Sequence, residues 1–251
     1  MLGKLFRPRA PKAEPVLPRV AEGTRVYAIG DIHGRLDLLE KIECRIADDA
    51  AASQAGRNVV VYLGDYVDRG NQSREVVDRL IDRPLPGFER ILLLGNHEES
   101  VLQFLADVQI GPAWLAYGGA ATLRSYGIRP PDSDRDLVRA QAELRAGLPE
   151  RHRAFLRGLK LRHVEGDYFF VHAGIRPGVP LNDQVPDDML WIRDEFLQSQ
   201  RDFGKIIVHG HTITKTPDIQ RNRIGIDTGA FASGTLTSLV LQGESWSFLQ
   251  T

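Results

Sequence analysis

The chain has 251 residues, of which 42% are hydrophobic and 26% charged, and this composition is typical of a soluble globular protein. Its net charge of −1 argues against sequence-independent binding of nucleic acid through a basic surface. A single cysteine, Cys44, excludes an internal disulfide, and no apolar run approaches the ~18 residues of a membrane span. We expect a cytoplasmic protein with no nucleic-acid or membrane partner, and leave its oligomeric state open.

The first 22 residues are basic and rich in proline. Such a composition buries too little apolar surface to order itself, so we expect residues 1–22 to form a flexible arm. A docking segment for an acidic partner is the alternative. Residues 23–251 are then expected to form one domain.

Apolar runs alternate with amphipathic segments over the first half of the chain. The predicted strands are residues 25–29, 58–63 and 90–94. Each precedes a predicted helix, at residues 37–52, 73–81 and about 98–108. We expect Cys44 to be buried in the first of these helices. This alternation indicates an α/β layered fold with largely parallel strand pairing.

The second half of the chain has a different pattern. Residues 111–160 are polar and helix-prone, and we expect a helical insertion that packs at the rim of the core. Strands are predicted again at residues 168–171, 205–208 and 223–226. Two last strands, 236–241 and 245–248, are expected to form a hairpin around Gly243.

Five short segments set metal-binding side chains beside a glycine and together hold five of the seven histidines. They read GDIHG at 30–34, GDYVDRG at 64–70, GNHE at 95–98, HAG at 172–174 and HGHT at 209–212. Each follows a predicted strand, and sites in open α/β sheets gather beyond the carboxyl ends of strands. The five segments are therefore predicted to converge on one site.

The residue types in these segments suit a pair of divalent transition-metal ions, which bind mixed oxygen and imidazole ligands. Asp31 and His33 are two residues apart, so a turning backbone can direct both at one ion. Asp65 has two carboxylate oxygens and can bridge two ions, while Asn96 offers an amide oxygen. A water held between two such ions becomes hydroxide at neutral pH.

In this order, the motifs GDxHG, GDxVDRG, GNHE, HAG and GHT resemble those of the phosphoprotein phosphatases. These are metal-dependent serine/threonine phosphatases within the calcineurin-like metallophosphoesterase superfamily. Residues 114–127 and 226–230 resemble the bacterial branch of that family. The resemblance covers roughly residues 24–240 and implies an α/β fold with a central β-sandwich of two mixed sheets flanked by helices.

The resemblance also implies which residues bind two metal ions, expected to be Mn²⁺ with Fe or Zn as alternatives. Asp65 would bridge the two ions. The first ion would be held by Asp31, His33 and His211, and the second by Asn96, His172 and His209. A polar cap at the strand end is the alternative for His209 or His211.

The remaining roles concern the substrate. His97 would face the leaving-group oxygen as general acid, and Asp68 would orient it. Arg69 and Arg193 would bind the phosphate, because the planar fork of arginine can bond two phosphate oxygens at once, with Arg176 as the alternative to Arg193. Three other ionisable residues lie outside these roles. We expect Glu98 to open the next helix rather than bind metal, and His152 and His163 to lie at the surface.

Together these features predict a metal-dependent phosphomonoesterase, specifically a serine/threonine protein phosphatase acting on a phosphorylated protein or a small phosphoester. A hydroxide held by both metals would attack phosphorus directly. One alternative is a symmetrical dinucleoside tetraphosphate hydrolase or another nucleotide phosphohydrolase, but the segment Val67-Asp68-Arg69-Gly70 favours the protein phosphatase. Another is a non-catalytic metal-binding interaction module, which the complete ligand set argues against.

Overall fold

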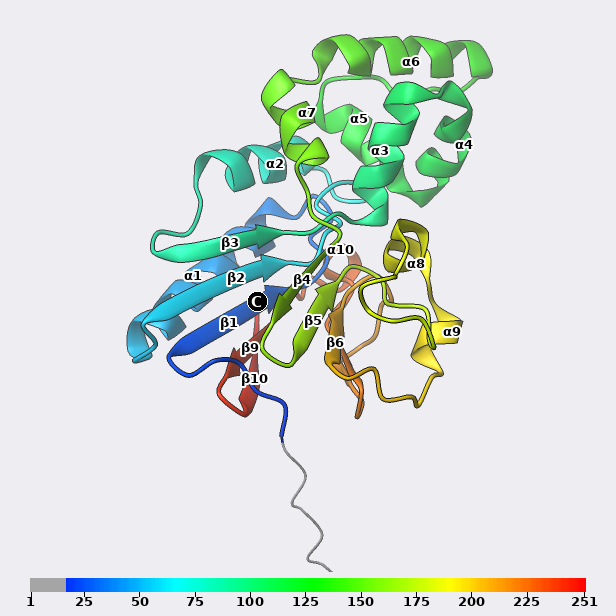
Figure 1. Ribbon diagram of the computed structural model, residues 1–251. Coiled ribbons are helices and arrows are strands. Elements are labelled where there is room, and N and C mark those ends of the chain that lie inside the picture. The colour runs from blue at the N-terminus through cyan, green and yellow to red at the C-terminus, as the bar shows by residue number, and fades with distance from the viewer. Residues whose placement is uncertain (1–16) are drawn as a thin grey trace, which may run out of the picture.

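A computed structural model describes residues 17–251 as two five-stranded sheets with helices around them (Figure 1). The first sheet, in the order β10-β9-β1-β2-β3, contains β1 (Thr24–Ile29), β2 (Arg57–Tyr62), β3 (Phe88–Leu92), β9 (Thr237–Gln242) and β10 (Ser245–Gln250). The second, in the order β4-β5-β6-β8-β7, contains β4 (Arg162–Glu165), β5 (Tyr168–Val171), β6 (Ile206–His209), β7 (Asp218–Ile219) and β8 (Arg223–Gly225). The expected fold class of two mixed sheets flanked by helices is confirmed.

The expectation of largely parallel pairing is only half right. Strands β1, β2 and β3 pair in parallel, as do β5, β6 and β8. The β1–β9, β9–β10, β4–β5 and β7–β8 pairs are antiparallel. Strands β4 and β5, like β9 and β10, follow each other without the crossover that a parallel pair requires. The predicted hairpin around Gly243 is the β9–β10 pair.

The helices predicted in the first half are confirmed with boundaries shifted by one or two residues. They are α1 (Leu36–Ala52), α2 (Ser73–Asp82) and α3 (Asn96–Ala106). Cys44 on α1 is exposed, contrary to expectation, because the buried face of that helix is formed by Leu38, Leu39, Ile42 and Ile46 instead. Within residues 17–251, no helix is long and apolar enough to cross a membrane.

Successive side chains along a strand point to opposite faces of its sheet, and the buried ones form three separate hydrophobic clusters. On β1, Val26 and Ala28 join the cluster between the two sheets, whereas Tyr27 and Ile29 join the cluster under α1 and α2. A third cluster covers the outer face of the second sheet and includes Phe196. It lies under α8 (Pro186–Trp191) and α9 (Asp194–Leu197).

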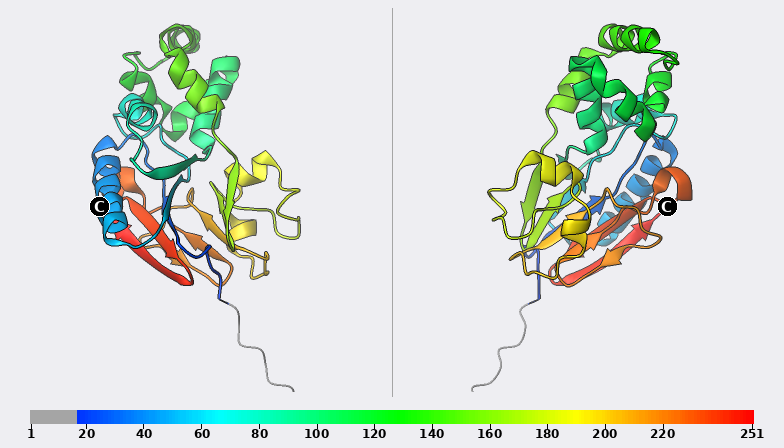
Figure 2. Two further views of the ribbon diagram at one scale, coloured as in Figure 1. Left: turned by 60° about the vertical axis from the view of Figure 1, so that its left-hand side comes forward. Right: turned by 90° about the vertical axis from the view of Figure 1, so that its right-hand side faces the viewer.

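A helical segment follows α3 and lies beyond one end of the two sheets (Figure 2). It consists of η1 (Val108–Ile110), α4 (Gly111–Trp114), the π-helical turn η2 (Leu115–Gly119), α5 (Ala120–Ser125), α6 (Asp134–Gly147) and α7 (Glu150–Arg157). Leu137, Leu144 and Leu156 of this segment share a buried cluster with α1, α2 and α3. One more short helix, α10 (Ala230–Ser233), precedes β9.

The segment expected to be a flexible arm is described only from residue 17 onward. Val20 is fully buried between the sheets, and its N–H donates to the carbonyl of Gly243 at 3.0 Å. Residues 17–22 therefore pack on the sandwich at this point, which moves the start of the packed chain before residue 23. The expectation for residues 1–16 lies outside the described residues, and the division into arm and domain stays a prediction.

The two sheets approach each other closely where β1 and β8 end. A Cβ placed on Gly30 would lie 2.6 Å from the carbonyl oxygen of Ile226 and 3.7 Å from the Cα of Asp227. No real Cβ is tolerated at the shorter distance, so only glycine allows the two strand ends to meet here. The contact places the residues after β1 beside those after β8.

Substituting Gly30 with alanine is expected to lower the free energy of unfolding by about 1–3 kcal/mol, because the added methyl forces the strand ends apart. Urea denaturation measures this value. Gly56→Ala is the matched control, since a Cβ there meets no atom within 4 Å. Equal stability of the two variants would contradict the close contact.

Candidate metal centre

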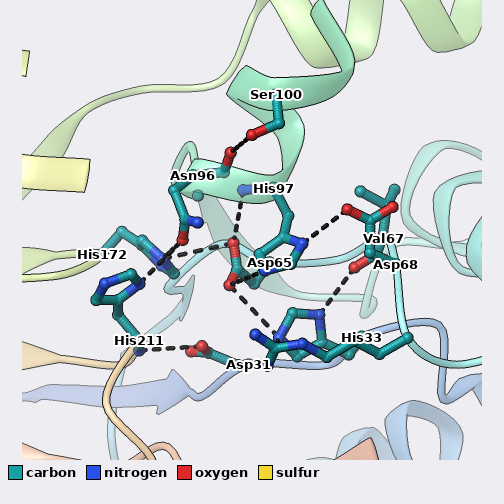
Figure 3. Close-up of polar contacts among 12 residues, drawn as sticks. Asp31, His33, Asp65, Val67, Asp68, Asn96, His97, Ser100, His172 and His211 are labelled. Atoms are coloured by element: carbon teal, nitrogen blue, oxygen red, sulfur yellow. Dashed lines mark hydrogen bonds and ion pairs between the residues drawn. The ribbon is translucent and has the colours of Figure 1, made fainter. Parts of the chain in front are cut away.

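The five motifs converge beyond the ends of β1, β2, β3, β5 and β6, as the sequence predicts (Figure 3). Seven polar side chains of these motifs gather here, and none of the seven is more than 6% exposed. They are Asp31, His33, Asp65, Asn96, His97, His172 and His211. Buried carboxylates and imidazoles at this density require either one another or a bound cation as partners.

The backbone is strained at this site. The non-glycine residues with positive φ in the described part of the chain are His33 (48°), Asp65 (52°), Asp68 (70°), Arg69 (66°) and His211 (63°). All five belong to the set predicted from the motifs. Left-handed conformations of this kind cost on the order of 1 kcal/mol each and persist where surrounding contacts enforce them. They turn the chain sharply after β1, β2 and β6.

Asp65 lies at the centre of the arrangement. Two groups of side chains offer ligand atoms within 4.8 Å of one another, His33–Asp65–His97 and Asp65–His172–His211. Oδ2 of Asp65 is 3.5 Å from Nε2 of His33, and Oδ1 is 3.4 Å from Nε2 of His172. The two oxygens thus serve different groups, which is the geometry a bridging carboxylate needs.

Asn96 joins the second group, and its contacts favour a division of ligands that differs from the expected one. Its Oδ1 lies 2.9 Å from Nε2 of His172 and 2.9 Å from Nδ1 of His211. His211 therefore lies with Asn96 and His172, rather than with Asp31 and His33. It contacts Asp31 only through its backbone N–H, which donates to Oδ2 at 3.0 Å.

His209 is not brought to the site with the others. Its ring lies edge-on to Phe196 at 5.1 Å between centroids, and its Nδ1 is 3.0 Å from the carbonyl oxygen of Gly210. As the last residue of β6, it shares a face with Ile207, which belongs to the outer cluster of the second sheet. The alternative of a structural histidine at the strand end fits His209.

The imidazoles are in the state that metal binding requires. Nδ1 of His33 lies 2.9 Å from the carbonyl oxygen of Val67, and Nδ1 of His172 lies 2.9 Å from that of Leu63. A carbonyl only accepts, so each Nδ1 carries the proton and each Nε2 keeps a lone pair toward Asp65, as in metal-bound histidines. Burial lowers the pKa of His33 to about 3 and also lowers the pKa of His172, so both are neutral.

Two atoms in this site lack any hydrogen-bond partner. Oδ1 of Asp31 and Nε2 of His211 are both buried and unpaired. Buried polar atoms are nearly always satisfied, so unpaired ones call for a missing partner. Both atoms are typical metal ligands, and the residues present therefore fit a pair of divalent ions.

His97 is held by Asp68, which is fully buried. Oδ2 of Asp68 accepts from Nδ1 of His97 at 2.7 Å and from Nε1 of Trp114 at 2.9 Å, while Oδ1 accepts from Oγ1 of Thr122 at 2.5 Å. Burial lowers the pKa of His97, but the charges of Asp65 and Asp68 outweigh it and raise the pKa above its usual value. This arrangement favours the imidazolium, with Nδ1 fixed.

Trp114 and Thr122 were missed as site residues. Both lie in the helical segment, in a stretch that the sequence marks only by its resemblance to bacterial phosphatases. Trp114 and Thr122 are 46 and 54 positions away from Asp68 in the sequence, so no local pattern encodes these contacts.

Arg69 is close to the expected metal ligands. Its N–H donates to the carbonyl of Gly118 at 3.2 Å, and its guanidinium carbon lies 4.8 Å from the ring centroid of Phe231. Its Nη1 is 2.8 Å from Nε2 of His33, the atom left free for metal. The guanidinium thus places a positive charge next to the expected metal ligands.

The two candidates for the second arginine have different partners. Nη1 of Arg193 donates to the carbonyl oxygen of His211 at 3.3 Å, and the side chain is otherwise exposed. Arg176 instead makes a two-pronged contact with Asp188 at 2.8 and 2.5 Å, and a third bond to Glu195 at 2.6 Å. The guanidinium of Arg176 is committed to these carboxylates, whereas Arg193 lies next to the site.

Glu98 opens α3, as expected, but it also fixes the neighbouring loop. Its fully buried carboxylate accepts backbone N–H bonds from Gly95 (3.0 Å), Asp65 (2.9 Å), Tyr66 (2.7 Å) and Val67 (3.1 Å). The contact with Gly95 is one half of a capping box, in which the residue at the third helical position accepts from the N-cap N–H. One side chain therefore joins the loop after β2 to the start of α3.

The two histidines expected at the surface are both at least partly buried. His152 is fully buried, with Nδ1 2.8 Å from Oη of Tyr126 and Nε2 2.9 Å from Oδ1 of Asp78. His163 is partly buried on β4. Neither belongs to the two potential metal groups found among residues 17–251.

Comparison with known proteins places this site in a family. Residues 24–230 match the calcineurin-like phosphoesterase family. The chain is 28% identical over 232 residues to the asymmetrical bis(5'-nucleosyl)-tetraphosphatase PrpE of Geobacillus thermodenitrificans, covering 84% of this chain and 88% of the relative. It is equally 28% identical over 225 residues to serine/threonine-protein phosphatase 2 of Salmonella typhimurium, covering 84% and 90%.

Solved structures show the same fold. A point mutant of a cold-active protein tyrosine phosphatase superposes with a TM-score of 0.63 at 18% identity. The superposition covers 93% of this chain and 82% of that one.

Replacing Glu98 with glutamine is expected to lower the free energy of unfolding by on the order of 3 kcal/mol. The substitution turns one carboxylate oxygen into an amide nitrogen, which cannot accept the backbone N–H bonds that the oxygen accepted. Urea denaturation of the metal-stripped protein measures the loss without a contribution from bound ions. Glu40→Gln, at an exposed position on α1, is the control and should change stability little. A similar, small effect of both substitutions would show that the carboxylate does not hold the loop.

Proposed function

Because the chain belongs to the calcineurin-like phosphoesterase family, we propose that it is a metal-dependent phosphomonoesterase acting as a serine/threonine protein phosphatase. The observation that carries the proposal is the 2.7 Å bond between Asp68 and Nδ1 of His97, beside the metal-ligand groups. A positioned imidazolium is the proton donor that an alkoxide leaving group requires. Cleavage of the phosphoester of a serine or threonine releases such an alkoxide.

The proposed division of metal ligands groups His211 with Asn96 and His172, because Oδ1 of Asn96 lies 2.9 Å from each of those rings. Asp31, His33 and Asp65 would hold the first ion, and Asp65, Asn96, His172 and His211 the second. We propose Mn²⁺, although Fe and Zn accept the same donor types. When bound, two such ions would offset the charge of the phosphate and lower the pKa of a water held between them.

Two arginines would bind the phosphate oxygens. Charge spreads over these oxygens as the phosphoryl group transfers, and guanidinium groups stabilise it by paired hydrogen bonds. Arg69 now contacts Nε2 of His33, and it would bind the phosphate instead when that nitrogen holds a metal. Arg193 would bind from the side of His211, because its Nη1 already reaches the carbonyl oxygen of that residue.

His97 would donate the proton from Nε2 to the leaving oxygen. Asp68 accepts from Nδ1 and so fixes the ring, and the bonds from Trp114 and Thr122 in turn fix Asp68. The charges of Asp65 and Asp68 raise the pKa of His97 against the effect of burial, which favours the protonated donor. The helical segment thereby sets the position of the proton donor.

Hydrolysis of dinucleoside tetraphosphates is the second candidate, because a relative at the same 28% identity carries that activity in its name. A phosphoserine or phosphothreonine peptide and diadenosine tetraphosphate should be assayed side by side with Mn²⁺. We expect the higher kcat/KM on the phosphopeptide. The reverse order would assign the chain to nucleotide hydrolysis, and no turnover of either substrate with two metals bound would favour a binding module.

His97→Asn and Asp65→Asn are expected to separate catalysis from metal binding. Removal of the proton donor should lower kcat on a phosphoserine peptide by about 10²–10⁴-fold while both ions remain bound. The loss should be smaller with para-nitrophenyl phosphate, whose leaving group needs no proton. Asp65→Asn should reduce the metal content itself.

Metal analysis by mass spectrometry, together with rates on both substrates, tests these outcomes. Equal losses on the two substrates for His97→Asn would contradict the role of proton donor.

A further inference from the structure

Asp227, directly after Ile226 at the end of β8, is a buried carboxylate that none of the roles above explains. It is 1% exposed. Its Oδ1 accepts the N–H of Gly229 at 2.9 Å, and this bond forms a turn with Gly229 in the left-handed region (φ 66°). Its Oδ2 is buried without a hydrogen-bond partner. The turn therefore accounts for one oxygen and leaves the other unexplained.

The fold places this free oxygen at the candidate metal centre. The contact at Gly30 joins the ends of β1 and β8, and Asp31 and Asp227 lie immediately beyond that contact. Oδ1 of Asp31 is likewise buried and unpaired. Two neighbouring buried carboxylates thus have one free oxygen each.

Two neighbouring buried carboxylates with an unpaired oxygen each call for a cation, because buried charges are paired or coordinate metals. The nearby guanidinium of Arg69 does not fill this role, since it already contacts His33 and Phe231.

The proposed ligand division leaves room for one more donor. With His211 in the second group, the first ion has three protein ligands, Asp31, His33 and Asp65, whereas the second has four. We propose that Oδ2 of Asp227 is a further ligand of the first ion. This inference rests on the proposed two-metal site and gives the first ion three carboxylates and one imidazole, a donor set that suits Mn²⁺.

Asp227→Asn separates this role from the turn. Asparagine keeps an oxygen that can accept the N–H of Gly229, but it replaces the free carboxylate oxygen with an amide. Asp202→Asn is the matched control, because Oδ1 of Asp202 accepts the N–H of Gly204 at 2.8 Å, also with a left-handed glycine (φ 75°), at an exposed position remote from the motifs. Should Asp227→Asn fail to fold, Asp227→Ser also keeps an acceptor for the turn.

The test is calorimetric titration of the metal-stripped proteins with Mn²⁺ alone, supported by the rise in Tm that Mn²⁺ produces. Wild type and Asp202→Asn should bind two ions. Asp227→Asn should bind one ion as tightly as wild type and the other at least about tenfold more weakly, with a smaller rise in Tm.

If the wild type binds two ions and Asp227→Asn binds both of them with unchanged affinity, this inference alone is overturned and the proposed function stands. Absence of Mn²⁺ binding to the wild type would overturn both.

Discussion

The buried carboxylate of Glu98 is the interaction on which the geometry of the site depends. It binds four backbone N–H groups, three in the loop after β2 and one at the start of α3. These same segments carry Asp65, Asn96 and His97. Asp65 completes the link in return, because its Oδ1 accepts the N–H of His97 at 3.1 Å. The bridging ligand and the proton donor therefore occupy one rigid unit.

This unit explains how the strain at the site can persist. Left-handed backbone at Asp65, Asp68 and Arg69 would relax in an isolated loop. Here the N–H of Asp68 donates to Ser73 and Thr122, and that of Arg69 to Gly118, so α2 and the helical segment hold the loop from the other side. These bonds lie within the protein chain itself and fix the geometry of the loop.

Much of this architecture can be read from the sequence, because it depends on local patterns. Apolar runs predict the strands, and glycine-flanked polar motifs after them predict convergence on one site. The division of ligands is different. His209 and His211 look equivalent in the sequence, yet the strand continues through His209 and directs it to the outer face of the sheet. His211 lies beyond the end of the strand, and its left-handed backbone turns its own side chain into the site.

Other parts of the site depend on distant contacts that no short pattern encodes. Trp114 and Thr122 support Asp68 only because the helical segment folds back over the end of the sheets. Asp227 looks like an ordinary turn residue before a glycine, and its relation to Asp31 arises only from the meeting of β1 and β8 at Gly30. The antiparallel strands β4 and β7, at the edges of the second sheet, are likewise not apparent from the alternation that predicts the parallel strands.

The origin of the second ligand group has a mechanical consequence. Asp65 and Asn96 come from the sheet that contains β1, whereas His172 and His211 come from the other sheet. Asn96 and His211 are 115 positions apart in the chain. An ion bound by all four would act as a cross-link that closes this long loop, and it would bind only the folded arrangement. The two sheets would then unfold in one cooperative transition. Metal supply would therefore set the cooperativity of unfolding as well as the catalytic activity.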